Sequence, residues 1–410
     1  MTANELQSVS VKTREYKVQD FKEITESFIN VRVTPEKVDT LLKSQTVYTP
    51  KSEAAVDKVY KLWGKLYIVY KDGNVCDCSG SAEISISKAE QGVEIALYPV
   101  LYKGERGVLI HEKNVKTKVV IYPSFFTIKL PEFEYVYMLG NLFFISNKNV
   151  LTYTDQVDFS KFNGEIVLPS ETGDVVGLAA LDKRLVAVCE RAVYLITAFG
   201  ESNEFTVERA VTIDKTAEKG SVTRVLDSVV FKCGKDLYTY KNKSVTKTRA
   251  EYLEDYLIDG YACEDKGVYV LPLKKGDDKY LFRHGISDNS DALIKVDNNT
   301  ATSEYMLVDN NVAVITDSSD GVGFGKGEWS SVLMDFSSQK KKTLLQMSAE
   351  VKGNVDVKVS GSAGSKTFEF NCQKNVKRPN YTSEKFRLTF DGIDFALQNL
   401  NLKYTEKGAN

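Results

Sequence analysis

Two histidines, His111 and His284, are the residues of this sequence best suited to acid–base chemistry near neutral pH. Neither stands in an H-E-x-x-H motif or in another metal-ligand spacing. A lone histidine near a strand end is typical of a surface residue or of a satisfied core residue. No serine occupies a G-x-S-x-G elbow, and Ser360–Gly364 is typical of a turn between strands. The sequence therefore predicts no catalytic residue, and we expect a protein that is not an enzyme.

Cysteine chemistry is also poorly supported. Cys76 and Cys78 are separated by one residue, whereas zinc knuckles and redox motifs use two or more. Cys189 and Cys233 lie inside apolar strand patterns, where a thiol behaves as a small hydrophobe. Scattered cysteines in a large chain are most simply explained by a reduced, cytoplasmic site of synthesis.

Three turns are rich in side-chain oxygens, the ligands that calcium prefers: 288–291, 297–299 and 317–321. None has the full EF-hand spacing, and turns of this composition are ordinary in hairpins. We therefore predict no metal site and no cofactor.

A glycine-rich loop runs from Gly321 to Gly327. A phosphate cradle needs such a loop to enter a helix, and nothing helical is expected after it. The loop is better interpreted as a long hairpin tip that can contact a partner. Trp63 and Trp329 could stack on a sugar, but a core position is the simpler expectation for each.

The amino-acid composition indicates which kind of secondary structure carries the residues discussed above. The chain has 410 residues, of which 42% are hydrophobic and 27% charged, with a formal net charge of −2. Nothing in this balance favours wrapping nucleic acid, which needs a surplus of Lys and Arg. No apolar stretch approaches the roughly 20 residues of a membrane span, and no signal peptide is visible. Abundant Tyr (22) and Phe (20) with scarce Pro (8) favour β-structure.

A strand-start pattern recurs about every 41 residues. Each copy is a short apolar run that follows a Gly, Asn or Asp within three positions. The seven starts are Leu66, Val108, Leu142, Leu185, Val229, Val268 and Val312. In three copies a second apolar run begins eight residues later, at Val150, Val193 and Leu237, which is typical of a hairpin. Such a hairpin cannot bury its own face, but repetition around an axis does. The period predicts an all-β chain with a β-propeller of six or seven blades.

The two ends of the chain lack this period. We expect an N-terminal arm or adaptor over residues 1–55, a propeller over 56–340 and a small C-terminal β-sandwich-like module over 341–410. In the arm, the spacing of Phe21, Ile24 and Phe28 and the run Pro35–Lys43 indicate short helices.

The C-terminal module shows strict alternation at 355–359 and 368–370, which predicts strands with one buried face. A further strand is expected over 386–390, followed by a turn at Asp391 and Gly392 and by strands over 395–397 and 400–402.

Residues 176–240 carry a resemblance. This segment contains the runs Val176–Ile196, Phe205–Val211 and Lys219–Tyr240. It resembles the propeller segments of bacteriophage tail hub and nozzle proteins, which close the distal end of short tails. The resemblance implies a structural component of the virion tail, assembled in the host cytoplasm. It also implies a homo-oligomer, possibly a hexameric ring, that contacts other tail proteins. The genomic DNA would pass through the ring, which would retain the genome and form its exit conduit. No catalytic residue is implied.

Two other classes of function remain open. The first is a carbohydrate- or protein-binding propeller without catalysis. The second is a propeller enzyme, which would need carboxylates or histidines converging from several blades at one axial end. No such set stands out in the sequence.

Overall fold

The computed structural model describes residues 13–40, 42–102, 104–113, 119–128, 130–140, 142–155, 161–198, 204–296, 305–308, 310–316, 321–373 and 375–406. The chain forms two compact units. One contains Ser44–Ser287 and Val296–Ile315 and is called the propeller below. The other contains Met1–Lys43, Asp288–Lys295 and Thr316–Asn410 and is called the terminal unit.

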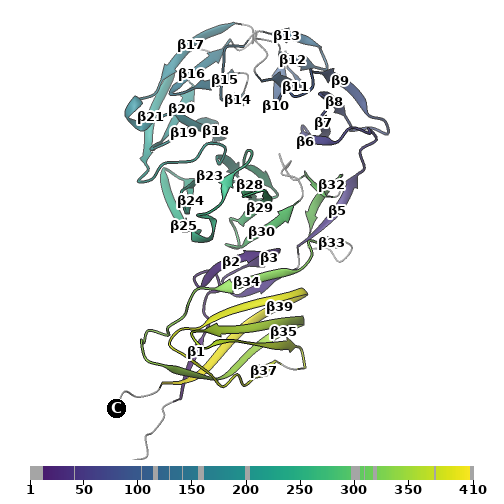
Figure 1. Ribbon diagram of the computed structural model, residues 1–410. Coiled ribbons are helices and arrows are strands. Elements are labelled where there is room, and N and C mark those ends of the chain that lie inside the picture. Colours follow the sequence, from purple (N-terminus) through teal and green to yellow (C-terminus); the bar gives the residue numbers. More distant parts are fainter. Residues whose placement is uncertain are drawn as a thin grey trace, which may run out of the picture. The chain divides into compact units, whose positions relative to one another are not determined.

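The described residues of the propeller form seven blades of antiparallel strands (Figure 1). The first three are β6 (Val56–Leu62), β7 (Lys65–Tyr70), β8 (Asn74–Asp77) and β9 (Ile84–Lys88); β10 (Ile95–Tyr102), β11 (Glu105–Glu112), β12 (Val119–Tyr122) and β13 (Phe126–Ile128); and β14 (Tyr135–Leu139), β15 (Leu142–Asn147), β16 (Val150–Thr154) and β17 (Phe162–Val167). The next two are β18 (Val175–Leu181), β19 (Arg184–Cys189), β20 (Ala192–Ala198) and β21 (Phe205–Thr212); and β22 (Thr223–Val225), β23 (Ser228–Cys233), β24 (Asp236–Lys241) and β25 (Ser244–Arg249).

The last two blades close the ring. The sixth contains β26 (Leu257–Ile258), β27 (Cys263–Asp265), β28 (Val268–Lys275) and β29 (Asp278–Gly285), which are part of a larger, 15-stranded sheet. The seventh places β31 (Tyr305–Val308) and β32 (Asn311–Thr316) beside β5 (Lys43–Tyr48), a strand from near the start of the chain. The innermost strands contact each other in the order β31, β6, β10, β14, β18, β22 and β27, as expected of blades arranged around an axis. The predicted propeller is confirmed.

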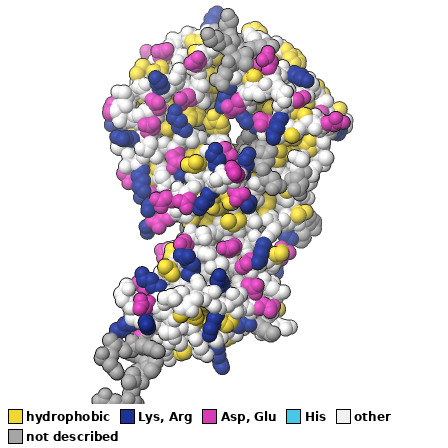
Figure 2. Space-filling view, in the orientation of Figure 1, with side chains coloured by type: hydrophobic (Ala, Val, Ile, Leu, Met, Phe, Trp, Pro, Cys, Tyr) yellow, Lys and Arg dark blue, Asp and Glu magenta, His cyan; other side chains and the backbone are white. Residues whose placement is uncertain are grey.

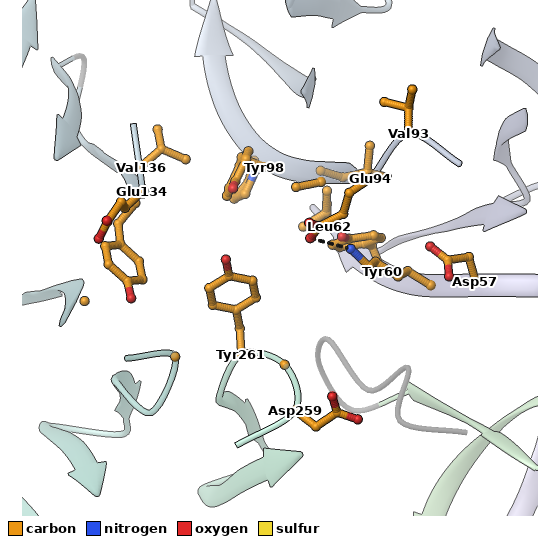
Figure 3. Close-up of a pocket in the computed structure, with 18 of the residues that line it drawn as sticks. Asp57, Tyr60, Leu62, Val93, Glu94, Tyr98, Glu134, Val136, Asp259 and Tyr261 are labelled. Carbon is orange, nitrogen blue, oxygen red and sulfur yellow. Dashed lines mark hydrogen bonds and ion pairs between the residues drawn. The ribbon is translucent and has the colours of Figure 1, made fainter. Parts of the chain in front are cut away.

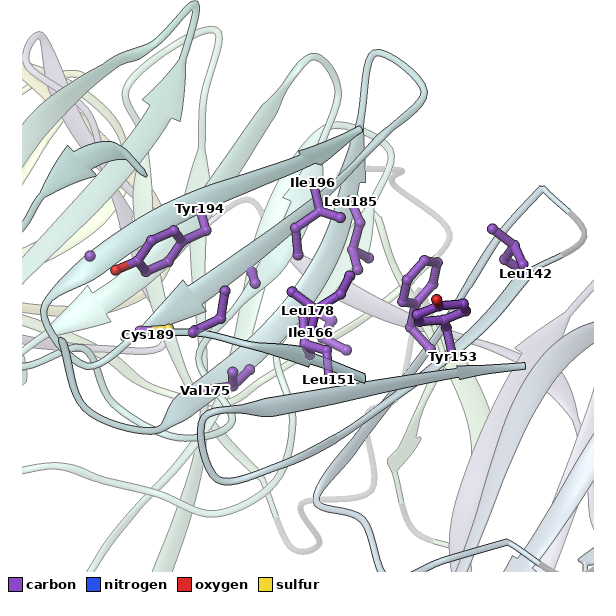
Figure 4. Close-up of a cluster of buried hydrophobic side chains, with 14 residues drawn as sticks. Leu142, Leu151, Tyr153, Ile166, Val175, Leu178, Leu185, Cys189, Tyr194 and Ile196 are labelled. Carbon is purple, nitrogen blue, oxygen red and sulfur yellow. The ribbon is translucent and has the colours of Figure 1, made fainter. Parts of the chain in front are cut away.

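The hydrophobic core of the propeller lies between neighbouring blades, and the middle strands show why their sequences are so apolar. In β19, Leu185 and Ala187 pack toward the blade of β14–β17, whereas Val186 and Val188 pack toward the blade of β22–β25. A strand that is buried on both faces must be apolar at successive positions, not at alternate ones. Figure 4 shows the cluster between the third and fourth blades, which joins Leu151 of β16 to residues of β19 and β20.

This packing explains the sequence period. All seven predicted strand starts lie in the second strand of a blade, namely β7, β11, β15, β19, β23, β28 and β32. The expected hairpin partners that begin at Val150, Val193 and Leu237 lie in β16, β20 and β24. Each repeated run is therefore the strand whose two faces are covered by neighbouring blades.

The terminal unit is organised around two strands of 20 residues, β35 (Lys342–Gly361) and β39 (Arg387–Glu406), which pair along most of their length. Short strands line both outer edges of this pair. On β39 these are β1 (Thr13–Lys17), β4 (Lys37–Asp39) and β34 (Gly327–Ser331); on β35 they are β36 (Gly364–Asn371), β37 (Val376–Lys377) and β38 (Tyr381–Ser383). The remaining strands of the unit are β2 (Thr25–Ile29), β3 (Val31–Val33), β30 (Asp291–Val296) and β33 (Val322–Gly323).

One core holds segments of the terminal unit that are far apart in sequence. Trp329 is fully buried, stacks on Phe390 with ring centroids 4.6 Å apart and meets the edge of Phe21 at 5.7 Å. Its indole Nε1 donates a hydrogen bond of 2.8 Å to the hydroxyl of Thr25. Residues 13–40, for which the sequence suggested an arm, thus supply strands and core residues to the same unit as the C-terminal module.

The two predicted N-terminal helices are wrong. Residues 37–39 form β4, and Thr34 caps a tight turn before it, accepting hydrogen bonds from the backbone N–H groups of Glu36 (3.3 Å) and Lys37 (3.1 Å). Threonine before a proline resembles a helix start in sequence, but the same hydroxyl also closes a turn. Phe21 lies in a turn, and Phe28 belongs to the strand β2.

The turn expected at Asp391 and Gly392 is also wrong, because β39 runs through both residues without interruption. Gly392 pairs with Val355, and a Cβ atom there would lie 2.7 Å from the carbonyl oxygen of Asn354. Glycine is therefore required by close backbone approach beside a register shift between Lys352 and Asn354, not by chain reversal. The predicted alternation at 355–359 is confirmed, with Val355, Val357 and Val359 buried.

Helical structure among the described residues consists of two short 3-10 turns, η1 (Ser170–Thr172) and η2 (Glu251–Leu253). None of the described helices could therefore cross a bilayer.

Candidate functional site

The structure does not bring the two histidines together. His111 lies in β11 with its ring 4.4 Å from that of Phe133, and its Nδ1 is buried without a hydrogen-bond partner among the described residues. Burial, with a further contribution from the charge of Lys113, lowers the pKa of His111. His284 is buried in β29, in the sixth blade.

The paired cysteines are buried packing residues. Cys76 and Cys78 lie in a core cluster between the first and seventh blades. Burial raises the pKa of Cys76 to about 11 and that of Cys78 to about 12. Both thiols are therefore protonated at neutral pH and poor nucleophiles.

The oxygen-rich turns are occupied by local contacts where the structure describes them. Asp288 accepts hydrogen bonds from the backbone N–H (3.1 Å) and the hydroxyl (2.8 Å) of Ser290, and Asp291 forms a buried ion pair of 2.7 Å with Lys22. Residues 297–299 and 317–320 lie outside the described residues. Among the described residues, no three His, Cys, Asp or Glu side chains gather in a way that could hold a metal ion.

The glycine-rich loop leads into a strand, since β34 begins at Gly327. A Cβ atom on Gly327 would lie 2.6 Å from side-chain atoms of both Val31 and Thr40, so this glycine permits close packing within the terminal unit. The loop borders a small pocket of about 250 Å³ with Asn30 and Ile393.

A cavity of about 930 Å³ lies inside the propeller. Its walls come from the inner strands β6, β10, β14, β18 and β22, or from residues next to them, and from the segment between β26 and β27. Two glycines allow close approach on one side of it. A Cβ atom on Gly177 would lie 2.4 Å from the Val222 side chain, and one on Gly220 would lie 2.6 Å from the carbonyl oxygen of Gly260.

Five tyrosines from five different segments line this cavity: Tyr60, Tyr70, Tyr98, Tyr135 and Tyr261. Figure 3 shows the hydroxyl of Tyr261 pointing toward Tyr98 across the open space. The rings of Tyr135 and Tyr261 meet edge to face with centroids 6.3 Å apart. Burial raises the pKa of Tyr60, Tyr98 and Tyr135, so these phenols stay protonated and can donate hydrogen bonds.

Carboxylates and lysines alternate around the same cavity. Glu94 accepts from Lys113 at 2.7 Å and from Lys58 at 3.1 Å. Burial acts to raise the pKa of Glu94, but the two lysines outweigh it and hold that pKa below its usual value. Glu134 pairs with Lys219 at 3.0 Å.

This cavity was not anticipated from the sequence. Trp63 and Trp329, for which the sequence left sugar stacking open, do not line the cavity. Trp329 is a core residue, as expected. The core position expected for Trp63 is wrong, because this residue is 37% exposed on a turn, where its Nε1 donates a hydrogen bond to the carbonyl oxygen of Gly107. A signal was present, because Tyr60, Tyr98 and Tyr135 precede the repeated strand starts by six, ten and seven residues. These positions are inner strands, and a tyrosine at the axis faces its counterparts from other blades.

No family model and no curated protein sequence matches this chain. Among solved structures, virginiamycin B lyase from Staphylococcus aureus is similar at 12% identity with a TM-score of 0.48, covering 67% of this chain and 98% of the lyase. The extracellular domain of a putative hybrid two-component system from B. thetaiotaomicron matches at 12% identity with a TM-score of 0.46, covering 74% of this chain and 42% of that one. PorZ, a surface component of the type-IX secretion system of Porphyromonas gingivalis, matches at 11% identity with a TM-score of 0.42, covering 80% of this chain and 46% of PorZ. The chain thus spans less than half the length of the last two.

Proposed function

We propose that this protein is a structural component of a bacteriophage tail. In this role, copies of the chain assemble into a hexameric ring around the DNA channel near the distal end of the tail. The ring holds the genome in place before infection and forms part of its exit conduit. The protein is assembled in the host cytoplasm, contacts other tail proteins and performs no catalysis.

The observation that carries this proposal is the place of residues 176–240 in the fold. The segment that resembles tail hub and nozzle proteins covers nearly all of the blade β18–β21 and the strands β22, β23 and β24 of the next blade. The apolar runs of the resemblance are the strands that bury both faces between blades. The similarity therefore follows consecutive strands of two adjacent blades rather than a scattered set of residues.

The surface is compatible with DNA passing by without adhering to it. The chain carries a formal charge of −2, and Figure 2 shows Lys and Arg intermingled with Asp and Glu on the visible face of the propeller. Tight non-specific binding of DNA requires many cationic contacts to phosphates. A mixed surface instead supports a conduit along which DNA slides.

Mass spectrometry of phage particles purified on a density gradient tests the proposal. Peptides from residues 184–198 and 387–404 are expected in the particle fraction at a fixed ratio to the other tail proteins. Recovery of the protein only from the soluble lysate, as a monomer, would contradict a role in the tail. Treating the particles with nuclease and high salt before the gradient is the control for loosely adsorbed protein.

A further inference from the structure

The cavity of the propeller has the properties of a built binding site. Its volume of about 930 Å³ lies near the upper end of the usual range for ligand pockets, roughly 300–1,000 Å³. Its lining combines apolar side chains such as Leu97 and Val136 with a few polar groups that converge from several blades. Several of these polar groups, including Asp57, Tyr98 and Tyr135, are carried by strands of the blades, which hold their positions.

The phenols supply both flat apolar faces and hydroxyl groups. Tyr261 is 46% exposed although it belongs to the cavity wall, and the hydroxyl of Tyr98 has no hydrogen-bond partner among the described residues. An unused phenol hydroxyl that faces an open cavity is available to a ligand. The ring face beside it can cover the C–H groups of a flat, partly apolar molecule.

Most of the carboxylates of the cavity wall are already paired with lysines. Glu94, Glu134 and Asp259 already face lysines, at 2.7, 3.0 and 3.6 Å. Lys113 also lies over the ring of Tyr261, 5.5 Å from its centroid, and so occupies the position that a cation would take there. One lining carboxylate, that of Asp57, has no ion-pair or hydrogen-bond partner among the described residues.

A neutral molecule rich in hydroxyl groups fits this pattern best. Its hydroxyls can donate to carboxylates such as Asp57 and exchange hydrogen bonds with the tyrosine hydroxyls. We infer that the axial cavity of the propeller binds a neutral carbohydrate, with Tyr98, Tyr261 and Asp57 as its principal contacts. This binding function goes beyond the structural role proposed above and does not depend on it.

The test uses the full-length purified protein and calorimetric titration with four probes: maltose, cellobiose, lactose and N,N′-diacetylchitobiose. At least one sugar is expected to bind. Tyr98→Phe removes a single hydroxyl and keeps the ring, so it is expected to weaken binding about tenfold, which corresponds to about 1.4 kcal/mol. Asp57→Asn is expected to weaken binding by a similar factor. Hydrogen exchange should slow on sugar addition in peptides that cover residues 91–99 and 257–262.

The matched control is Tyr305→Phe, a change of the same chemistry in β31 of the propeller, outside the cavity wall. It is expected to leave sugar affinity unchanged. Failure of all four sugars to bind, or binding that survives both Tyr98→Phe and Asp57→Asn, overturns the inference. Titration with tetramethylammonium distinguishes the competing ligand class, and its binding in place of sugar would also overturn the inference. None of these binding results bears on whether the protein is present in virions. The sugar-binding proposal and the tail-protein proposal can therefore be contradicted independently.

Discussion

The propeller and the terminal unit are both built from antiparallel strands, yet they join those strands in opposite ways. In the fourth blade, β19 pairs with β18 and β20, its immediate neighbours in sequence, through turns of two residues. In the terminal unit, β39 pairs with β1, so that Thr13 lies opposite Thr405. Blades can thus form from local contacts, whereas the terminal unit must close long loops before its core exists. This difference determines which deletions and substitutions each unit tolerates. It also determines how well the strands of each unit can be predicted from the sequence.

Removal of residues 1–42 is expected to have the largest effect. It should destabilise the terminal unit and leave the propeller folded. The deletion takes away β1 to β4 and with them Phe21 and Thr25, which pack around Trp329. Amide exchange in β35 and β39 should accelerate at least about tenfold, while β19 and β23 stay protected because their partners are local. Hydrogen-exchange mass spectrometry measures both regions in one experiment. Continued protection of β35 and β39 would contradict the role given to the N-terminal segment.

Trp329→Ala tests the same core with a single side chain. Loss of this fully buried ring, its stacking on Phe390 and its hydrogen bond to Thr25 is expected to cost about 3–5 kcal/mol of unfolding free energy in the terminal unit. Urea denaturation, followed by circular dichroism and by exchange in β39, measures the loss. Trp63→Ala is the control, because Trp63 is 37% exposed on a turn and should cost far less.

Gly177→Ala probes the propeller where two inner strands approach each other. The added methyl group would lie 2.4 Å from Val222, so β18 and β22 must move apart, at an expected cost of about 1–3 kcal/mol. Thermal unfolding of the propeller, followed by amide exchange in β19 and β23, measures the effect. Gly80→Ala, where nothing lies within 4 Å of the new Cβ atom, should stay within about 0.5 kcal/mol of the parent protein. Equal effects of the two substitutions would show that the close approach does not matter.

The smallest predicted effect concerns pH and the cavity of the propeller. Because Lys113 and Lys58 hold the pKa of Glu94 below its usual value of 4.5, their ion pairs stabilise the propeller above about pH 4.5. This contribution is lost as the pH falls through the folded-state pKa. Glu94→Gln should therefore lower stability at pH 7 by about 0.5 kcal/mol, since solvent screens a half-exposed pair, and this effect should diminish as the pH falls through the folded-state pKa of Glu94. Urea titrations of both proteins at a series of pH values between 7 and 3 check this. A difference that stays constant over this range would exclude the ion pairs as its cause.

The same contrast explains which features could be read from the sequence. The propeller was predictable because runs such as Leu185–Cys189 are buried on both faces and recur in every blade. The strand over 25–29 was not predictable, since its partner β34 lies about 300 residues away and local spacing suggested a helix. The strand over 37–39 pairs both with its neighbour β3 and with the distant β39, but the run that begins at Pro35 suggested a helix start.

The cavity was only partly predictable. Tyrosines precede several repeated strands, but no local rule states that Tyr98 and Tyr261 face one open space. That arrangement depends on closure of the ring, including the contribution of β5 to the seventh blade. Closure brings together segments whose individual sequences carry no sign of a common site.

Cryo-electron microscopy of the tail of purified phage particles tests the structural role most directly. The proposal predicts ring-shaped density around the DNA channel into which several copies of the propeller fit, with side-chain features that match β19 and β23. A complete tail reconstruction with no density for this chain, from a phage that expresses it, would contradict the proposal.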